Sequence, residues 1–326
     1  MADIRAGDSG IASRVPALGM PRHHLAIFVG LLIFMLVAPY FLYPVFLMKV
    51  MCFALFACAF NLLLGYGGLL SFGHAAFFGS ASYVSAHAAK VWGLTPELAV
   101  LSGVVVAALL GLVIGALAIR RQGIYFAMVT LAFAQMIFFF SVQAAFTGGE
   151  DGIQAVPRGK LFGVFDIAPD RVFYFFVLAI VFAGLLIIYR IVHSPFGHIL
   201  KAIRENEPRS ISLGYHVNRY KLAVFVMSAT LAGLAGATKA LVFQLASLTD
   251  VYWTMSGEVV LMALLGGMGT VFGPIVGAAI VVSLQNYFAG FGAWVTVIEG
   301  VVFVIGVLLF REGIVGVIAR WTKRSL

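Results

Sequence analysis

The residues that could do chemistry in this 326-residue chain are few and far apart. A catalytic or metal centre needs several His, Cys, Asp or Glu residues held at defined spacings. The two cysteines, Cys52 and Cys58, have neither disulfide nor metal spacing, and we interpret them as small packing residues. No G-x-x-x-x-G-K-[ST] run is present, so any nucleotide chemistry must come from a partner chain. The sequence therefore predicts no enzyme activity, no metal and no cofactor bound by this chain. The scattered histidines, none with partners at metal spacing, are His23, His24, His74, His87, His193, His198 and His216.

One dense polar block, residues 196–221, interrupts the apolar sequence with "FGHILKAIRENEPRSISLGYHVNRYK". Its apolar residues Phe196, Ile199, Leu200 and Ile203 follow helical spacing, which predicts a short amphipathic helix. We expect Pro208 to break that helix and a second short segment to cover residues 209–213. Such a pair can rest on lipid headgroups or dock into a groove of a partner protein. The acids within "ENE" favour docking, because anionic lipid would repel them.

The composition around this block is that of a membrane protein. Hydrophobic residues make up 62% of the chain, charged residues 10%, and the mean hydropathy is +1.06. Apolar runs of about 20 residues recur without strand alternation, which predicts an all-α polytopic membrane protein. We expect about ten transmembrane helices, of which one or two are short or broken, and an uncleaved first span. The expected spans are 24–43, 45–65, 74–92, 97–119, 124–146, 171–191, 221–243, 255–268 (short), 270–290 and 293–311.

The distribution of basic residues predicts the orientation. Alternate loops gather fifteen Lys and Arg residues on one side, with four on the other and two inside spans. The positive-inside rule places the richer side in the cytoplasm. The cytoplasmic parts are then the N-terminal tail 1–23, the polar block with its flanks at 194–220, and the C-terminal tail 312–326. The membrane domain covers 24–311, and its polar loop 147–170 faces outward. The net charge of +8 follows from this topology, so we expect no nucleic-acid partner.

Two glycine-rich runs interrupt spans in the two halves of the chain. "GYGGLLSFGHAAFFG" and "LLGGMGTVFGPIVG" share paired glycines followed by a hydroxyl residue, Phe and Gly. Broken helices at membrane depth are tolerated where they are buried in protein or line a cavity, and in transporters they often mark the path. The alternative is close helix packing, since Gly273 and Gly277 form a GxxxG pair. The candidate path residues are Asn61, Gly67, Gly68, Ser71, Gly73, His74, Glu258, Gly266, Gly267 and Gly269. Of these, Asn61, Ser71 and His74, together with Gln135, could equally make packing hydrogen bonds.

Four charged residues fall in or near spans, where ionised groups are costly. We expect Lys49 and Lys239 to extend toward the membrane surface. Glu258 fits a helix N-terminus, where its charge is favourable, and Glu299 fits a contact between helices.

The polar block and the span after it, "SPFGHILKAIRENEPRSISLGYHVNRYKLAVFVMSATLAGLAGA", closely resemble LivM-type permeases. These are membrane subunits of bacterial ABC importers for branched-chain amino acids. The resemblance continues through residues 61–86, 124–135, 147–153 and 261–280, in the family's order. It implies that the polar block is the segment that couples to an ATPase subunit. The "EAA" pattern of other importers fits loosely, because Glu207 precedes Pro208 and Gly214 follows seven residues on. The implied coupling residues are Phe196, Gly197, Lys201, Arg204, Glu205, Asn206, Glu207, Leu213 and Gly214.

The resemblance also implies the partners. These are a LivH-type homologous permease, two ABC ATPase subunits that hold ATP and Mg²⁺, a periplasmic solute-binding protein, and the lipid of a bacterial inner membrane. The expected function is import of branched-chain or other hydrophobic amino acids, and the alternative is import of urea, short amides or related small solutes. An ion-coupled secondary transporter would need a polar cluster near the bilayer midplane, for which only Glu299 offers itself. It would also leave the polar block without a purpose. The sequence does not fix the substrate, and whether the permease pair is hetero- or homomeric stays open.

Overall fold

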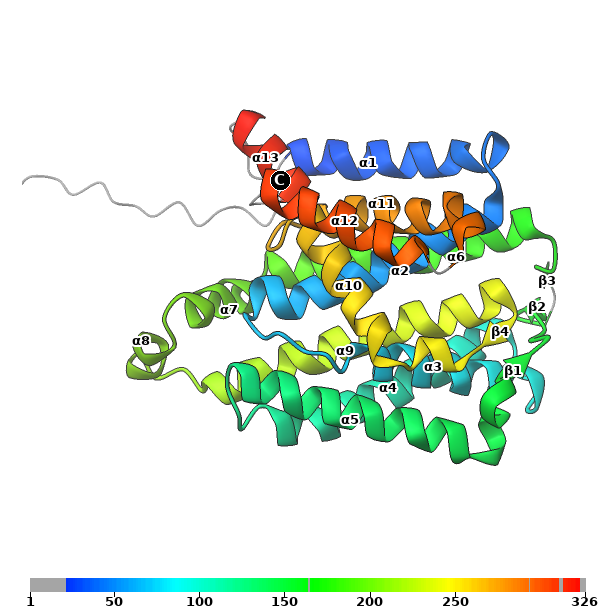
Figure 1. The fold of residues 1–326 in the computed structure, drawn as a ribbon, viewed down its shortest axis with the longest axis horizontal. Coiled ribbons are helices and arrows are strands. Elements are labelled where there is room, and N and C mark those ends of the chain that lie inside the picture. The colour runs from blue at the N-terminus through cyan, green and yellow to red at the C-terminus, as the bar shows by residue number, and fades with distance from the viewer. Residues whose placement is uncertain (1–21, 164, 293, 311–312, 323–326) are drawn as a thin grey trace, which may run out of the picture.

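The computed structural model describes residues 22–163, 165–292, 294–310 and 313–322, and they form a helical bundle (Figure 1). The predicted N-terminal tail 1–23 lies outside these ranges except for its last two residues, whereas most of the predicted C-terminal tail 312–326 is helix α13. The fold class of the described part is all-α, as predicted. Its helices are α1 Arg22–Val37, α2 Pro44–Asn61, α3 His74–Lys90, α4 Pro96–Ala118, α5 Ile124–Gln143, α6 Asp170–Val192, α7 Pro195–Glu205, α8 Glu207–Ser212, α9 Val217–Phe243, α10 Trp253–Gly266, α11 Gly273–Tyr287, α12 Trp294–Leu309 and α13 Gly313–Thr322.

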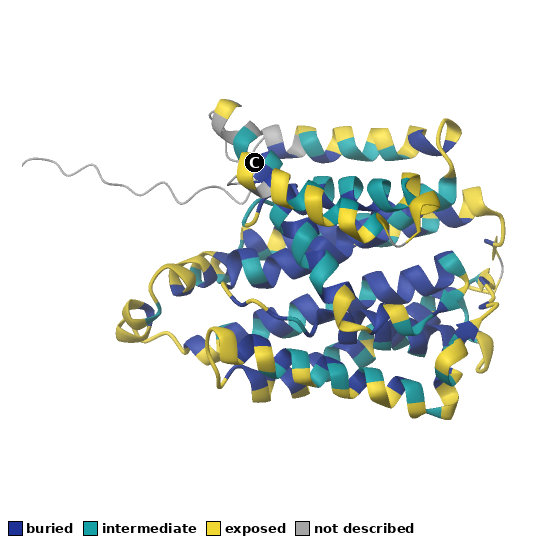
Figure 2. Ribbon diagram, viewed as in Figure 1, coloured by how far each residue is buried: buried dark blue, intermediate teal, exposed yellow. Residues whose placement is uncertain are grey.

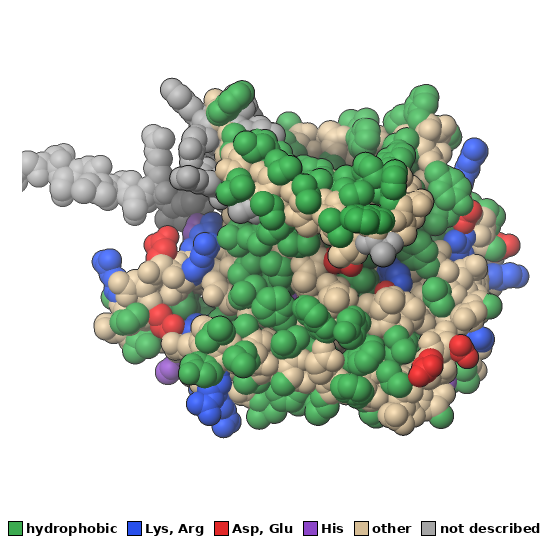
Figure 3. All heavy atoms as spheres, in the orientation of Figure 1, with side chains coloured by type: hydrophobic (Ala, Val, Ile, Leu, Met, Phe, Trp, Pro, Cys, Tyr) green, Lys and Arg blue, Asp and Glu red, His purple; other side chains and the backbone are tan. Residues whose placement is uncertain are grey.

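Within the described residues, five helices are long and apolar enough to cross a membrane, namely α2 with its extension to Tyr66, α4, α5, α6 and α9. Shorter apolar helices lie at Ala26–Tyr40, Trp253–Gly266 and Trp294–Gly306. The predicted short span is confirmed as α10, which has 14 residues and ends at Gly266. Hydrophobic side chains cover the middle of the molecule in Figure 3, and most charged side chains lie at its two ends. This distribution is that of a protein whose middle part lies in the lipid bilayer.

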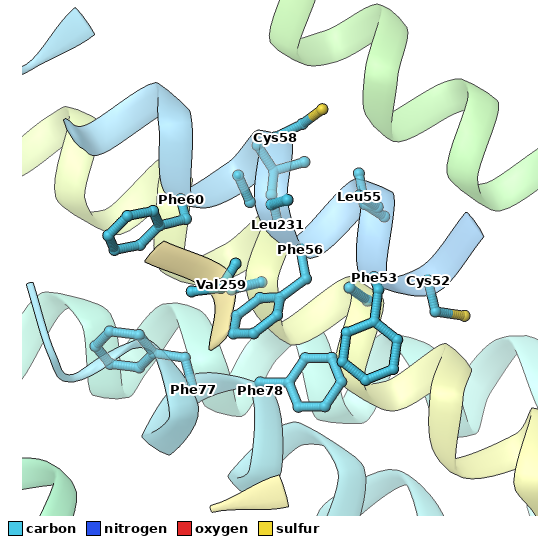
Figure 4. Close-up of a cluster of buried hydrophobic side chains, with 14 of the residues drawn as sticks. Cys52, Phe53, Leu55, Phe56, Cys58, Phe60, Phe77, Phe78, Leu231 and Val259 are labelled. Atoms are coloured by element: carbon cyan, nitrogen blue, oxygen red, sulfur yellow. The ribbon is translucent and has the colours of Figure 1, made fainter. Parts of the chain in front are cut away.

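The core forms where α2 and α9 pass through the middle of the bundle. Figure 2 shows both helices and α3 as the most deeply buried elements, whereas α1, α5 and α12 expose one face. Figure 4 shows Phe56 of α2 against Phe78 of α3, with ring centroids 4.5 Å apart. Cys52 and Cys58 are buried and free, which confirms the packing interpretation.

Small residues let the helices approach closely. A Cβ added to Gly236 of α9 would overlap the carbonyl oxygen of Phe78 in α3. A Cβ added to Gly277 of α11 would overlap the carbonyl oxygen of Met262 in α10. Close backbone contact of this kind holds helices together where lipid removes the hydrophobic drive for association. The GxxxG pair of Gly273 and Gly277 therefore does take part in helix packing, which was the alternative to a broken helix that lines the path.

The loop 147–170 lies at one end of the bundle and is fastened to it. Strand β1 (Ile153–Gln154) pairs with β4 (Leu245–Ala246), and β2 (Lys160–Leu161) pairs with β3 (Phe165–Asp166). The buried guanidinium of Arg158 donates hydrogen bonds to the carbonyl oxygens of Ala168 and Val242, at 3.1 and 3.0 Å, and to the carboxylate of Asp170. The loop is thus an ordered cover for the ends of α6 and α9.

The polar block lies at the opposite end as two helices, α7 and α8 (Figure 1). The position predicted for the break is wrong. The backbone leaves the helix at Asn206, whose side-chain oxygen accepts a hydrogen bond from the Arg209 amide at 3.0 Å. Pro208 lies in the first turn of α8, where a missing N–H costs nothing.

Candidate functional site

The amphipathic helix predicted from residue 196 is α7, and its apolar stripe packs on the bundle itself, which the sequence did not predict. Leu200 and Ile203 are buried, and the ring of Phe196 stacks on that of Tyr220 with centroids 5.5 Å apart. Ser194 caps the helix by accepting a hydrogen bond from the Gly197 amide at 3.3 Å. Gly197 itself fits against the end of α6, where a Cβ would meet backbone carbonyl oxygens. The helix is therefore held firmly along one side, and its polar side is exposed.

Two basic residues of α7 reach the first glycine-rich segment. Arg204 donates a hydrogen bond to the carbonyl oxygen of Gly65, and the ammonium of Lys201 lies 5.3 Å from the ring centroid of Tyr66. Gly65 and Tyr66 belong to a π-helical turn, Leu62–Tyr66, that continues α2. Such turns widen a helix and free carbonyl groups, and they are frequent at functional sites. Helix α7 is thus bonded directly to the end of α2.

The first residue of α8 is tied to the bundle. Glu207 accepts hydrogen bonds from Lys221 of α9 at 2.8 Å and from Gln122, in the link between α4 and α5, at 3.2 Å. Five of the predicted coupling residues therefore contact other parts of this chain, namely Phe196, Gly197, Lys201, Arg204 and Glu207. Glu205 and Asn206 are exposed.

The outward face of α8 is apolar at its far end. Ile211 is 58% exposed and Leu213 is 69% exposed, and the positive φ of Gly214 then turns the chain back toward α9. Leu213 and Gly214 were predicted as coupling residues, whereas Ile211 was missed. The sequence did offer a signal for Ile211. It is an apolar residue within a polar block, and it does not belong to the apolar stripe of the preceding helix.

The two glycine-rich segments meet at Asn61, the last residue of α2. Its side-chain amide donates to the carbonyl oxygen of Thr270 at 2.8 Å, and its side-chain oxygen accepts from the Gly269 amide at 3.0 Å. Residues 209 and 208 positions apart in sequence are joined here through backbone groups that lie outside any helix. Asn61 is 2% exposed, and both hydrogen bonds are partly buried.

The two segments also end in the same way. Ser71 accepts a hydrogen bond from the Gly73 amide at the start of α3, and Thr270 accepts one from the Gly273 amide at the start of α11, both at 3.1 Å. The sequence similarity between the two runs thus corresponds to a repeated helix start. Left-handed backbone at Gly68, Gly267 and Gly269 makes the turns that precede these starts. Gly67 and Gly266 are buried within the same turns.

His74 opens α3 in a fully buried position. Its Nε2 lies 2.8 Å from the hydroxyl oxygen of Ser228, which donates its own proton to the carbonyl oxygen of Ala59 at 2.5 Å. Nε2 must therefore carry the imidazole proton, and the unprotonated Nδ1 is buried without a hydrogen-bond partner among the described residues. Three helices are joined through this chain of bonds, because Ala59 lies on α2 and Ser228 on α9. His74 thus makes a hydrogen bond that packs helices together, which was the alternative to a role in the transport path.

The expectation that Lys239 extends to the membrane surface is wrong. Its ammonium donates to both carboxylate oxygens of Asp250 at 2.7 Å, and the two side chains are 10% and 2% exposed. Asp250 also closes a capping box with Ser247 at the following 3₁₀ turn. The pairing was not visible in the sequence, because Asp250 lies in the loop beyond α9.

Of two further intramembrane charges, one differs from expectation. Lys49, in the second turn of α2, is half-buried, and its extension toward the membrane surface stays a prediction. Glu258 is the sixth residue of α10, past its first turn, and accepts a hydrogen bond from Gln285 of α11 at 3.1 Å. Glu299 of α12 interacts with the same glutamine, which confirms the expected contact between helices.

Comparison with known proteins decides the family. The model of a family described as "Branched-chain amino acid transport system / permease component" matches residues 42–310. The chain belongs to this family. It is 27% identical over 287 residues to the high-affinity branched-chain amino acid transport system permease protein LivM of Salmonella typhimurium, covering 81% of this chain and 68% of that protein. The LivM protein of Escherichia coli is also 27% identical, over 288 residues and the same shares. We find no significant match among solved structures.

The matched region contains nearly every feature described above. It begins just before α2 and ends after α12, so it includes the α7–α8 pair, the π-helical turn and both glycine-rich segments. The chain is thus a multi-pass membrane permease, and the two helices that protrude from it are part of the shared fold.

Proposed function

We propose that this chain is the membrane permease subunit of an ABC importer that moves branched-chain or other hydrophobic amino acids into the cytoplasm. Family membership supports the reaction class, and the names of the LivM relatives support the substrate class. The observation that carries the coupling role is the α7–α8 pair, which protrudes from the bundle and ends in the exposed side chains of Ile211 and Leu213.

The proposal includes the orientation. The chain would cross a bacterial inner membrane ten times, with both termini and the α7–α8 pair in the cytoplasm and the 147–170 loop outside. The positions of the basic residues support this arrangement. Helix α3 and the short α10, with their preceding or following glycine turns, would supply the two broken spans.

The proposed partners are a LivH-type permease, two ATPase subunits and an external solute-binding protein. ATP and Mg²⁺ would reside in the ATPase subunits, and this chain would be non-catalytic. Exposed apolar residues on a polar helix pair suit a hydrophobic groove in an ATPase subunit.

The bonds inside the chain suggest how the movement is passed on. A shift of α7 acts through Arg204 on the π-helical turn, and through Asn61 on the second glycine-rich segment. Asn61, Ser71 and His74 would hold this junction together, and the accessible residues Gly68 and Glu258 would face the path. Nucleotide binding would then shift the population between two arrangements of the junction.

The test is co-purification of the tagged chain with the ATPase subunits, followed by uptake into vesicles. We expect Leu213→Asp to remove the ATPase subunits and abolish ATP-driven leucine uptake, because the carboxylate would have to be buried in an apolar groove. The matched control is Val91→Asp, which places the same charge on an exposed apolar residue at the opposite end. Full uptake without any ATPase subunit would refute the importer mechanism.

A further inference from the structure

Three exposed arginines lie at the end of the bundle that bears α7 and α8, where α4 ends and α9 begins. They are Arg120, Arg121 and Arg219, and we call them the arginine patch. Within the described residues, none of the three has an ion pair within 4.0 Å or a hydrogen bond from its guanidinium. Arg204 and Lys221, at the same end, are bonded inside the chain. The patch therefore keeps its charges and donors open to an outside partner.

The packing of α4 against α9 brings the three arginines to one place. A Cβ added to Gly115 of α4 would lie 2.9 Å from the side chain of Leu222 in α9. Arg219 precedes Leu222 by three residues, so it lies on the same face of α9, one turn nearer the end that bears α7 and α8. Arg120 and Arg121 follow Gly115 by five and six residues and reach the same level. Figure 3 shows Lys and Arg side chains gathered at this end, beside the start of α5.

The surroundings of the patch place it at the membrane surface. Residues 119–123 form a short link between α4 and α5, both of which are long and apolar enough to cross a membrane. Tyr125, at the start of α5, is exposed, and tyrosine is typical of the membrane–water boundary. Leu109, Val113 and Leu117 form an exposed apolar stripe on α4 that leads up to the patch. The patch thus lies at the depth of lipid headgroups, with a surface for acyl chains beside it.

The acid bonded to this link does not balance the patch. Glu207, the first residue of α8, accepts hydrogen bonds from Lys221 at 2.8 Å and from Gln122 at 3.2 Å. Lys221 therefore matches the charge of Glu207, and the three positive charges of the patch stay unmatched. Gln122 also ties the link that carries Arg120 and Arg121 directly to α8.

A phosphate group is the anion that suits such a site. The planar guanidinium group can donate two parallel hydrogen bonds to phosphate oxygens. Basic residues directly beyond the cytoplasmic end of membrane helices are typical of binding sites for anionic lipid headgroups. An ATPase subunit fits the patch less well, because α7 and α8 protrude past the short link in Figure 1 and would meet that subunit first.

We propose that the arginine patch binds the phosphate headgroup of an anionic phospholipid in the cytoplasmic leaflet, with the acyl chains along α4. The bound lipid holds the link between α4 and α5 in place, and through Gln122 and Glu207 it steadies the start of α8. Lipid composition thereby regulates how readily the α7–α8 pair is held ready for its ATPase partner. The inference rests on the proposed orientation and importer function, to which it adds a lipid as a regulator.

The first experiment measures lipid binding to the full-length chain in mild detergent by native mass spectrometry, with phosphatidylglycerol and phosphatidylcholine as probes. We expect tight binding of phosphatidylglycerol alone. The double variant Arg121→Gln with Arg219→Gln should weaken it about 25-fold, at about five-fold for each arginine near an anionic headgroup. The matched control Lys160→Gln with Arg171→Gln removes two exposed charges at the opposite end and should bind like wild type.

Equal binding of phosphatidylglycerol by the double variant and its control, within two-fold, overturns the inference. Equal affinity of the wild type for phosphatidylcholine also overturns it, because the headgroup charge is then not recognised. If the double variant cannot be purified, the single variant Arg121→Gln, with an expected five-fold loss, decides by the same comparison with Lys160→Gln.

The second experiment uses proteoliposomes that hold the whole importer complex, with ATP inside and leucine-loaded binding protein outside. In phosphatidylcholine alone, we expect leucine uptake and ATP hydrolysis by the wild type to fall together by several-fold relative to membranes that also contain phosphatidylglycerol. Their ratio should stay constant, because the bond of Arg204 to the π-helical turn is intact. The double variant should show the lower rates in both membranes.

Wild-type rates that do not depend on phosphatidylglycerol overturn the regulatory role. Loss of the ATPase subunits from the double variant, with lipid binding unchanged, overturns the whole inference, because the patch is then a protein contact. Absence of ATP-driven uptake by the wild-type complex in both membranes instead refutes the proposed importer function, while the binding experiment still decides whether the patch holds lipid.

Discussion

Replacing Asp250 by Asn tests the buried ion pair with Lys239 most directly. The change keeps the size of the side chain but removes the charge that the ammonium faces at 2.7 Å. Because both side chains are at most 10% exposed, water cannot replace the lost carboxylate. Removing one partner of such a pair costs about 3–5 kcal/mol. At about 2–4 °C per kcal/mol, the thermal transition should fall by roughly 6–20 °C.

The assay is thermal unfolding of the purified protein in mild detergent, followed by the loss of monodisperse protein on size exclusion. The informative control is the double variant Lys239→Met with Asp250→Leu, which removes both charges and keeps apolar volume. We expect it to be more stable than Asp250→Asn, because no uncompensated charge remains buried. If Asp250→Asn unfolds within 2 °C of wild type, the idea that the buried ion pair stabilises the fold is refuted.

Three further predictions concern helix contacts and the junction. Gly236→Ala should destabilise the bundle by about 1–3 kcal/mol, because the added methyl group meets a backbone carbonyl of α3. The control Gly300→Ala has open space around it and should be neutral or slightly stabilising in the same thermal assay. Asn61→Ala should lower stability by about 1–3 kcal/mol, since it removes two partly buried hydrogen bonds to the backbone of the second glycine-rich segment. An unchanged transition would show that the segment is held by other contacts. Arg204→Gln should lower leucine uptake per ATP hydrolysed by several-fold, because α7 loses its hydrogen bond to the π-helical turn. The control Arg120→Gln changes an exposed residue and should keep the wild-type ratio of uptake to hydrolysis. The same ratio in Arg204→Gln and wild type would show that Arg204 does not couple ATP hydrolysis to transport.

Much of the fold could be predicted from local features of the sequence. Long apolar runs marked the membrane helices, and the spacing of Phe196, Leu200 and Ile203 marked α7, since a helix in lipid must satisfy its backbone internally and show an apolar face. The break before α8 was misplaced by two residues, because an Asn cap and a Pro in the first turn look alike in sequence.

The charged residues show the limit of such reasoning. The preference of a lysine for the membrane surface is a property of one side chain and one helix. Asp250 outweighs that preference for Lys239, and it comes from another element. The sequence cannot show that these two groups meet, because only the return of the loop after α9 brings them within reach.

The sequence by itself determined that this chain is a helical membrane protein, because hydropathy acts within one helix, and its motifs showed which permease family it resembles. The distribution of its basic residues predicts the side on which the polar block lies. Only the tertiary structure decided what each polar residue does. Asn61 and His74 hold helices together, Arg204 joins α7 to the π-helical turn, and Lys239 pairs with Asp250, since a buried polar group takes whichever partner the packing of other elements supplies.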